Sequence, residues 1–234
     1  MLDVIYEDEA ILVAAKPCGL PLTSAQEGGD SLLGQIKKHL KEKNPQAEPF
    51  AALVHRLDRQ AGGIVVAALD RKSAAELSRQ VQSRELKRTF YAVVRSCPRD
   101  KSGELTDYLI KDTATWRVRI APRSTEGAKK AQLTYKVLQS VSCGEQTLTL
   151  LALRPATGIA HQMRVQLAGM GCPVWGDRVY GGALEKKGSP TALWGVSTTL
   201  IHPVKGDKRT FLCYPQTDTP WKLFDIELAP DCSD

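Results

Sequence analysis

The sequence predicts an α+β protein, because short runs typical of strands occur along the chain together with two stretches of helical periodicity. Residues 64–69 form an unbroken apolar run that opens with β-branched side chains, as expected of a buried strand. Residues 89–95 alternate between two apolar sets, which predicts a strand sheltered on both faces. Apolar residues recur at helical spacing in 32–40 and 74–81, so each segment is expected to bury one face of a helix.

Capping residues mark where the helices are expected to begin. Asp30 or Ser31 can cap the first helix, and Asp70 or Ser73 can cap the second, since a short polar side chain accepts from the first free backbone N–H groups. Thr157 is the candidate cap of a third helix, in which apolar residues follow at helical spacing.

Further strands are expected from apolar or alternating runs between turn signals. An acidic segment separates the first two runs, which predicts an N-terminal hairpin. These strands are expected at residues 2–6, 10–15, 132–138 and 147–153.

The composition is that of a soluble globular protein, with 42% hydrophobic and 25% charged residues in a chain of 234. No apolar run approaches the length of a membrane span, and the acidic N-terminal residues do not resemble a signal peptide. The six cysteines are scattered without a Cys-x-x-Cys pair, which indicates reduced core residues. Reduced cysteines predict a cytoplasmic protein, which we also expect to be a monomer. The sequence has no nucleotide-binding glycine motif and no metal-ligand cluster, so no cofactor is expected.

Positive charge is concentrated in two stretches, although the net charge is only +6. Residues 111–136 hold seven Lys or Arg against two acidic residues, and residues 71–88 hold six against two. Lys129 and Lys130 follow Gly127 and are expected to lie in a loop that could grip phosphates. Such a distribution suits a polyanion, although a solvated surface has the same signature.

An ionisable cluster precedes the buried strand at residues 64–69. His55, Arg56, Asp58 and Arg59 lie just before a Gly-Gly pair, so Asp58 is expected on a turn at the entrance of that strand. Neighbouring guanidinium groups favour the charged form of a carboxylate. Asp58 could therefore act as a nucleophile or a base, although a pattern of this kind is more often a salt-bridged turn. His55 is expected to make structural hydrogen bonds near the turn.

The segment His55 to Arg59, followed by glycine and an aliphatic strand, resembles the active-site motif of the RluA-type pseudouridine synthases. Other segments resemble motifs of that family in the same order along the chain. They are residues 6–20, 86–92, 157–164, 171–181 and 193–203.

The resemblance implies a central mixed, mostly antiparallel sheet with flanking helices, the pseudouridine synthase fold. It implies a single catalytic domain over residues 1–234 without a separate N-terminal RNA-binding module. The implied reaction is the isomerisation of specific uridines of rRNA or tRNA to pseudouridine, with RNA as the partner.

The resemblance also assigns roles to individual residues. Asp58 is implied to be catalytic and Arg164 to pair with it. Arg56 is implied to fill the space left by the extruded uridine, and Phe90 to stack on the base. His161, which shares a helical face with Arg164, is a further candidate for substrate binding, as are Lys129 and Lys130.

Two other functions are compatible with the sequence. The family usually has Tyr at the position of Phe90, and it has Arg and then a hydroxyl or basic residue at Ile159 and Ala160. These departures favour an RNA-binding protein of the same fold without catalysis. A hydrolase of N-glycosidic bonds is the other alternative, but such enzymes commonly pair two acids, and no second acid lies close to Asp58 in the sequence.

Overall fold

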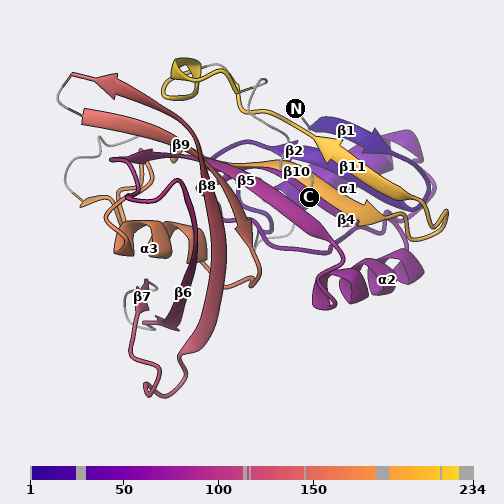
Figure 1. Cartoon of the computed structure of the whole chain (residues 1–234). Coiled ribbons are helices and arrows are strands. Elements are labelled where there is room, and N and C mark those ends of the chain that lie inside the picture. Colours follow the sequence, from indigo (N-terminus) through magenta and orange to yellow (C-terminus); the bar gives the residue numbers. More distant parts are fainter. Residues whose placement is uncertain are drawn as a thin grey trace. The chain divides into compact units, whose positions relative to one another are not determined.

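The computed structural model describes residues 2–24, 30–112, 115, 117–144, 146–182, 190–216 and 218–226 (Figure 1). Within it the chain forms two compact units. Unit 1 comprises Met1–Arg88 and Gly195–Cys213, and unit 2 comprises Thr89–Trp194 and Tyr214–Asp234.

Unit 1 contains a sheet whose strands run in the order β1-β2-β4-β10, with β3 beside β4 and β11 beside β10. The N-terminal hairpin is confirmed, and β2 pairs with β1 and β4 in antiparallel fashion. The strands are β1 (Asp3–Glu7), β2 (Ile11–Lys16), β3 (Ala52–Leu53), β4 (Gly62–Ala68), β10 (Leu193–Ile201) and β11 (Lys208–Leu212).

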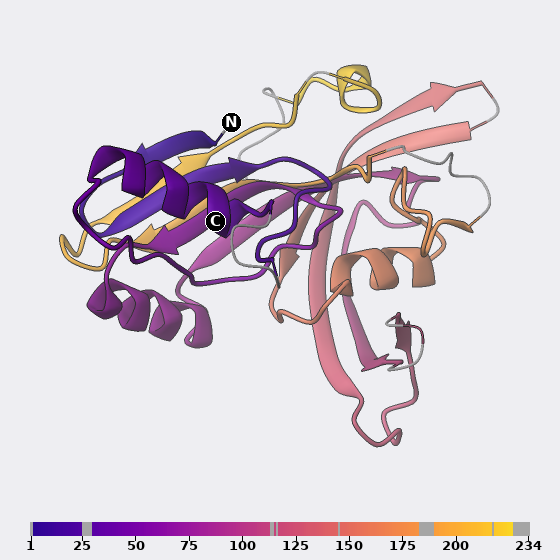
Figure 2. The ribbon, with the colours of Figure 1, turned by 180° about the vertical axis from the view of Figure 1, so that it is seen from behind.

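Two helices of unit 1 begin where capping residues predict them. The Ser31 hydroxyl accepts from the Gly34 amide ahead of α1 (Leu32–Lys43), and the Asp70 carboxylate accepts from the Ser73 amide ahead of α2 (Arg71–Gln82). The two opposite views place α1 over the face of this sheet that is turned toward the viewer in Figure 2.

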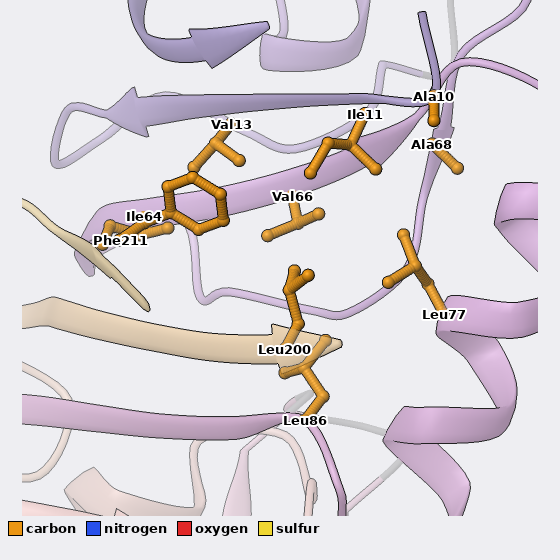
Figure 3. Packing of buried hydrophobic residues seen from close by; sticks show 10 residues of the cluster. All are labelled: Ala10, Ile11, Val13, Ile64, Val66, Ala68, Leu77, Leu86, Leu200 and Phe211. Atoms are coloured by element: carbon orange, nitrogen blue, oxygen red, sulfur yellow. The ribbon is translucent and has the colours of Figure 1, made fainter. Parts of the chain in front are cut away.

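The hydrophobic core of unit 1 collects side chains from strands and from α2. Figure 3 shows Leu77 of α2 pointing toward side chains of β4 and β10, including Val66 and Leu200. All seven residues of β4 are buried, so the prediction of a buried strand after the Gly-Gly pair is confirmed.

Unit 2 contains a sheet with the strand order β5-β9-β8-β6-β7. Its pairings β5 with β9, β9 with β8, β8 with β6 and β6 with β7 are all antiparallel. The strands are β5 (Lys87–Arg95), β6 (Ser102–Lys111), β7 (Val118–Ile120), β8 (Lys129–Cys143) and β9 (Gln146–Pro155). Helix α3 (Gln162–Gly169) packs Val165 against Leu109, Val118 and Ala131 of β6, β7 and β8.

Several local predictions for unit 2 are wrong. Lys129 and Lys130 begin β8 instead of lying in a loop. The N-cap of α3 is His161, while the Thr157 hydroxyl donates to the side chain of Gln162. Strand β6 was not predicted, and neither was β11 of unit 1, because polar residues interrupt the apolar pattern of both. Cys97 and Cys143 are exposed rather than in the core, and Cys232 lies outside the described residues.

Gly63 lies where β4 passes β10 at close range. Its φ of +114° belongs to the region that favours glycine, and a Cβ at this position would collide with the backbone of Gly195. We expect Gly63→Ala to lower the free energy of unfolding by more than about 3 kcal/mol, because the clash adds to the backbone strain. Gly206→Ala is the matched control, since its φ is +73° and its Cβ would meet open space. Thermal denaturation of both variants compares the two costs, and equal losses would contradict the close-approach argument.

Candidate active site

Asp58 lies on a tight turn at the entrance to β4. Its carboxylate oxygen Oδ1 accepts from the Gln60 amide at 3.1 Å, and its carbonyl accepts from the Ala61 amide at 3.1 Å. Asp58 is half-buried. The predicted position on a turn ahead of a core strand is therefore confirmed, and the carboxylate is partly accessible.

Lys16, at the end of β2, ties this turn to the preceding loop. Its Nζ donates to the carbonyls of Pro17, Leu20 and Arg59 at 2.9, 2.8 and 3.2 Å, and the side chain is fully buried. Burial lowers the pKa of Lys16 to about 8, while the charge of Asp58 acts in the opposite direction. No role was predicted for Lys16; the signal in the sequence was a lysine that ends an apolar strand before a Pro-containing turn.

Arg59 also binds that loop. Its Nε donates to the Gly19 carbonyl at 2.9 Å, and the Gly19 amide donates to the Arg59 carbonyl at 2.8 Å. The residue after Asp58 is thereby fixed by two hydrogen bonds to the chain around Gly19.

His55 has the structural hydrogen-bonding role that was predicted for it. The Val66 amide of β4 donates to His55 Nε2 at 3.1 Å, so the proton of the neutral ring belongs on Nδ1. Nδ1 lies 3.2 Å from Arg88 Nη1, which also donates to the Arg56 carbonyl at 2.9 Å. Burial and the adjacent Arg88 charge lower the pKa of His55 to about 3.

Arg56 combines a fixed backbone with an exposed side chain. Its carbonyl is held by Arg88, whose own pKa is lowered by burial. The side chain is therefore presented to solvent from a backbone with little freedom to move.

In unit 2, Arg164 of α3 forms a buried ion pair with Asp177. Nε donates to Oδ2 and Nη2 donates to Oδ1, both at 2.7 Å, in the bidentate geometry typical of strong Arg–carboxylate pairs. Asp177 Oδ1 also accepts from the amides of Val179 and Tyr180. The family resemblance implies that Arg164 pairs with Asp58, and Asp177 was missed although its Gly-Asp pair lies in the matching segment 171–181. The pairing of Arg164 with Asp58 stays a prediction.

Tyr180 contacts both His161 and Arg164, the two residues that were expected to share a helical face. Its hydroxyl lies 2.8 Å from His161 Nδ1 and accepts from the Val118 amide at 3.0 Å. The Arg164 guanidinium carbon lies 5.1 Å from the centre of the Tyr180 ring. His161, with φ of +54°, is thus held at the start of α3 by a tyrosine that sequence reasoning missed.

Phe90 lies on β5 opposite Leu153 and is only 3% exposed. A buried ring is compatible both with the core and with the wall of a base pocket, so its predicted stacking role stays a prediction.

Lys129 and Lys130 do not act as one group. Lys129 is opposite Leu109 and Lys130 is opposite Tyr108 in the pairing of β8 with β6, so their side chains leave opposite faces of the sheet. Both are exposed.

No group of three His, Cys, Asp or Glu side chains within the described part of the chain is arranged to hold a metal ion. Among those same residues, no helix combines the length and the apolar character needed to cross a membrane.

Residues 10–169 match the model of the RNA pseudouridylate synthase family. A relative described as dual-specificity RNA pseudouridine synthase RluA, from Escherichia coli strain K12, is 33% identical over 214 residues, which cover 90% of this chain and 91% of the relative. The protein of the same description from Haemophilus ducreyi is 31% identical over 220 residues, covering 92% of this chain and 93% of the relative. The chain belongs to the RluA-type family of RNA pseudouridine synthases.

Solved structures of this family share the fold at lower identity. Human RNA pseudouridylate synthase domain containing 4 superposes with a TM-score of 0.74 at 23% identity, covering 92% of this chain and 89% of that one. Human RNA pseudouridylate synthase domain containing 1 gives 0.75 at 20% identity, covering 93% and 84%. The predicted α+β pseudouridine synthase fold is confirmed.

The contributions of Arg164 and Asp177 to the stability of unit 2 are expected to depend on each other. Arg164→Met leaves a fully buried carboxylate without its charge partner, so we expect the free energy of unfolding to fall by about 3–5 kcal/mol. Asp177→Asn should also destabilise the protein, and the double variant should lose at least about 1 kcal/mol less than the sum of the single losses. Urea denaturation of the three variants measures this coupling, and strict additivity would argue against it.

His55 should make stability depend on pH. Its pKa is lowered from 6.5 to about 3 on folding, so below pH 6.5 the unfolded chain binds a proton that the folded chain does not. The free energy of unfolding should therefore fall as the pH falls from 6.5 toward 3, with about 2 kcal/mol lost between pH 7 and pH 5. His55→Gln should lower stability at pH 7 but remove this contribution to the slope. Urea denaturation at several pH values tests it, and identical slopes would show that His55 is not the titrating group.

Proposed function

We propose that the chain isomerises uridines of RNA to pseudouridine with Asp58 as the catalytic carboxylate. The observation that carries this assignment is a half-buried carboxylate on a turn whose neighbours are held on both sides, by Lys16 at Arg59 and by Arg88 at Arg56. A reacting group that is already positioned avoids part of the entropic cost of reaching the transition state.

The reaction requires little other equipment. The N1–C1′ bond of the uridine breaks, the base turns, and a C5–C1′ bond forms, with no net oxidation and no group supplied from outside. An ionised carboxylate can attack C1′, add to the base or remove a ribose proton. Each of these roles needs the ionised form of Asp58, which neighbouring cations favour.

Arg164 is proposed to orient and stabilise the Asp58 carboxylate, as the family resemblance implies. A guanidinium carries five N–H donors, and the two hydrogen bonds to Asp177 use Nε and Nη2. The pair with Asp177 would thus fix the plane of the guanidinium, and a bond to Asp58 would not require that pair to break.

Arg56 and Phe90 are proposed to receive the extruded nucleotide. Extrusion of a stacked base costs about a few kcal/mol, and the exposed Arg56 side chain would fill the vacated space. Phe90 would contribute stacking on the base, worth about 1–3 kcal/mol. The ring has no hydroxyl, so it offers stacking without a proton-transferring group.

The RNA substrate is proposed to be rRNA or tRNA, and the site of action the cytoplasm, with the protein acting as a monomer. The relatives from Escherichia coli and Haemophilus ducreyi are described as dual-specificity enzymes, which supports more than one RNA substrate. His161, Lys129 and Lys130 are proposed to contact the RNA, since cations that neutralise phosphates supply much of such affinity.

Asp58→Asn is expected to reduce isomerisation at least ~100-fold, because the amide cannot replace the carboxylate as nucleophile or base. The fold should persist, since the Asn side-chain oxygen can still accept from the Gln60 amide. Release of tritium from C5-labelled uridine in unmodified rRNA and tRNA transcripts measures turnover, and the melting temperature controls for folding.

Substantial turnover by Asp58→Asn would remove Asp58 from the chemistry. Absence of tritium release by the parent protein on every transcript would favour the RNA-binding protein without catalysis. Release of free uracil instead of pseudouridine would favour the hydrolase.

A further inference from the structure

The sheet of unit 2 has a second surface, on the side away from α3. Residues that face each other across antiparallel strands share a face. Leu109, Val118 and Ala131 pack against Val165 of α3, so their alternating neighbours point to the other side. We call this other side the outer face. It carries Glu104, Thr106, Tyr108, Arg119, Lys130, Gln132, Thr134, Lys136 and Arg154.

The outer face is exposed and positively charged. Each of its residues named above is exposed or partly exposed. It carries four cations, and Arg123, which contacts Tyr108, adds a fifth. Its one acid, Glu104, accepts hydrogen bonds from Gln132 and Thr106. A surface of this charge attracts a polyanion.

Tyr108 distinguishes this surface from a merely solvated basic sheet. The ring is partly exposed on β6, opposite Lys130 of β8, and the Arg123 guanidinium carbon lies 5.9 Å from its centre. Proteins that bind single-stranded nucleic acid combine an aromatic ring, on which a base stacks, with cations that follow the backbone. A guanidinium plane beside the ring offers a second flat surface for a base.

We propose that the outer face binds single-stranded RNA, with Tyr108 stacking on a base and Arg119, Arg123 and Lys130 contacting phosphates. The inference rests on the proposed function insofar as RNA is the substrate. Arg164 belongs to α3 on the opposite face of this sheet, so the outer face is a surface distinct from the one that carries Arg164. Lys130 belongs to this second surface and Lys129 to the α3 side, although they are adjacent in sequence.

The test measures binding of fluorescein-labelled oligouridylate by anisotropy, in an Asp58→Asn background so that turnover does not consume the probe. Tyr108→Ala should weaken binding about 5- to 100-fold, whereas Tyr108→Phe, which keeps the ring, should bind within about twofold of the parent. Lys130→Ala should reduce the slope of log affinity against log salt by about 0.7, the value for one phosphate on a single strand. Lys37→Ala, which removes an exposed cation from α1 of unit 1, is the control and should leave both the affinity and the salt slope unchanged.

Photo-crosslinking keeps the test decisive if Tyr108→Ala is less stable than the parent. With oligouridylate containing 4-thiouridine, the folded parent should form adducts on the peptide that contains Tyr108. Unchanged affinity of a folded Tyr108→Ala variant, or adducts confined to residues of the α3 side, would overturn the proposal. Failure of the proposed catalysis is a separate result, because it would abolish tritium release by the parent without changing the effect of Tyr108→Ala on oligouridylate binding.

Discussion

The close approach of β4 to β10 is the constraint on which unit 1 depends. Gly63 and Gly195 allow it because neither residue has a side chain, and a Cβ on Gly63 would meet the Gly195 backbone. Gly63 is the second residue of β4 and follows shortly after the Asp58 turn along the chain. The position of the carboxylate therefore follows from backbone packing that no other residue type at Gly63 would permit.

Buried polar groups hold the candidate active-site residues in both units. Lys16 and His55 are almost completely removed from water; Lys16 donates to the Arg59 carbonyl in the Asp58 turn, and His55 accepts from the Val66 amide of β4. Arg164 and Asp177 form a buried pair in unit 2. Burying such groups costs free energy unless they are fully hydrogen-bonded, so these sites tolerate few alternative arrangements.

The alternation of side chains along a strand divides the cations of residues 111–136 between two faces of a sheet, which the net charge of the stretch does not reveal. Residues 111–136 have seven cations in the sequence, but the pairing of β8 with β6 sends Lys129 and Lys130 to opposite faces. One face packs against α3, which carries Arg164, and the other exposes Tyr108 beside Arg123. The cations of this stretch are therefore divided between two faces of the sheet.

The sequence by itself determined the α+β class, the helix caps Ser31 and Asp70, the buried strand β4 and the turn at Asp58. These features depend on residues close together along the chain, where periodicity and capping act. The tertiary structure decided that Arg164 binds Asp177, that Tyr180 joins His161 to β7, and that Lys16 is buried beneath the Asp58 turn. Such partners are separated along the chain by 13 to 62 residues, and side-chain type alone does not select among the many possible pairings. Only the register of the strands and the packing of the helices bring them within hydrogen-bonding distance.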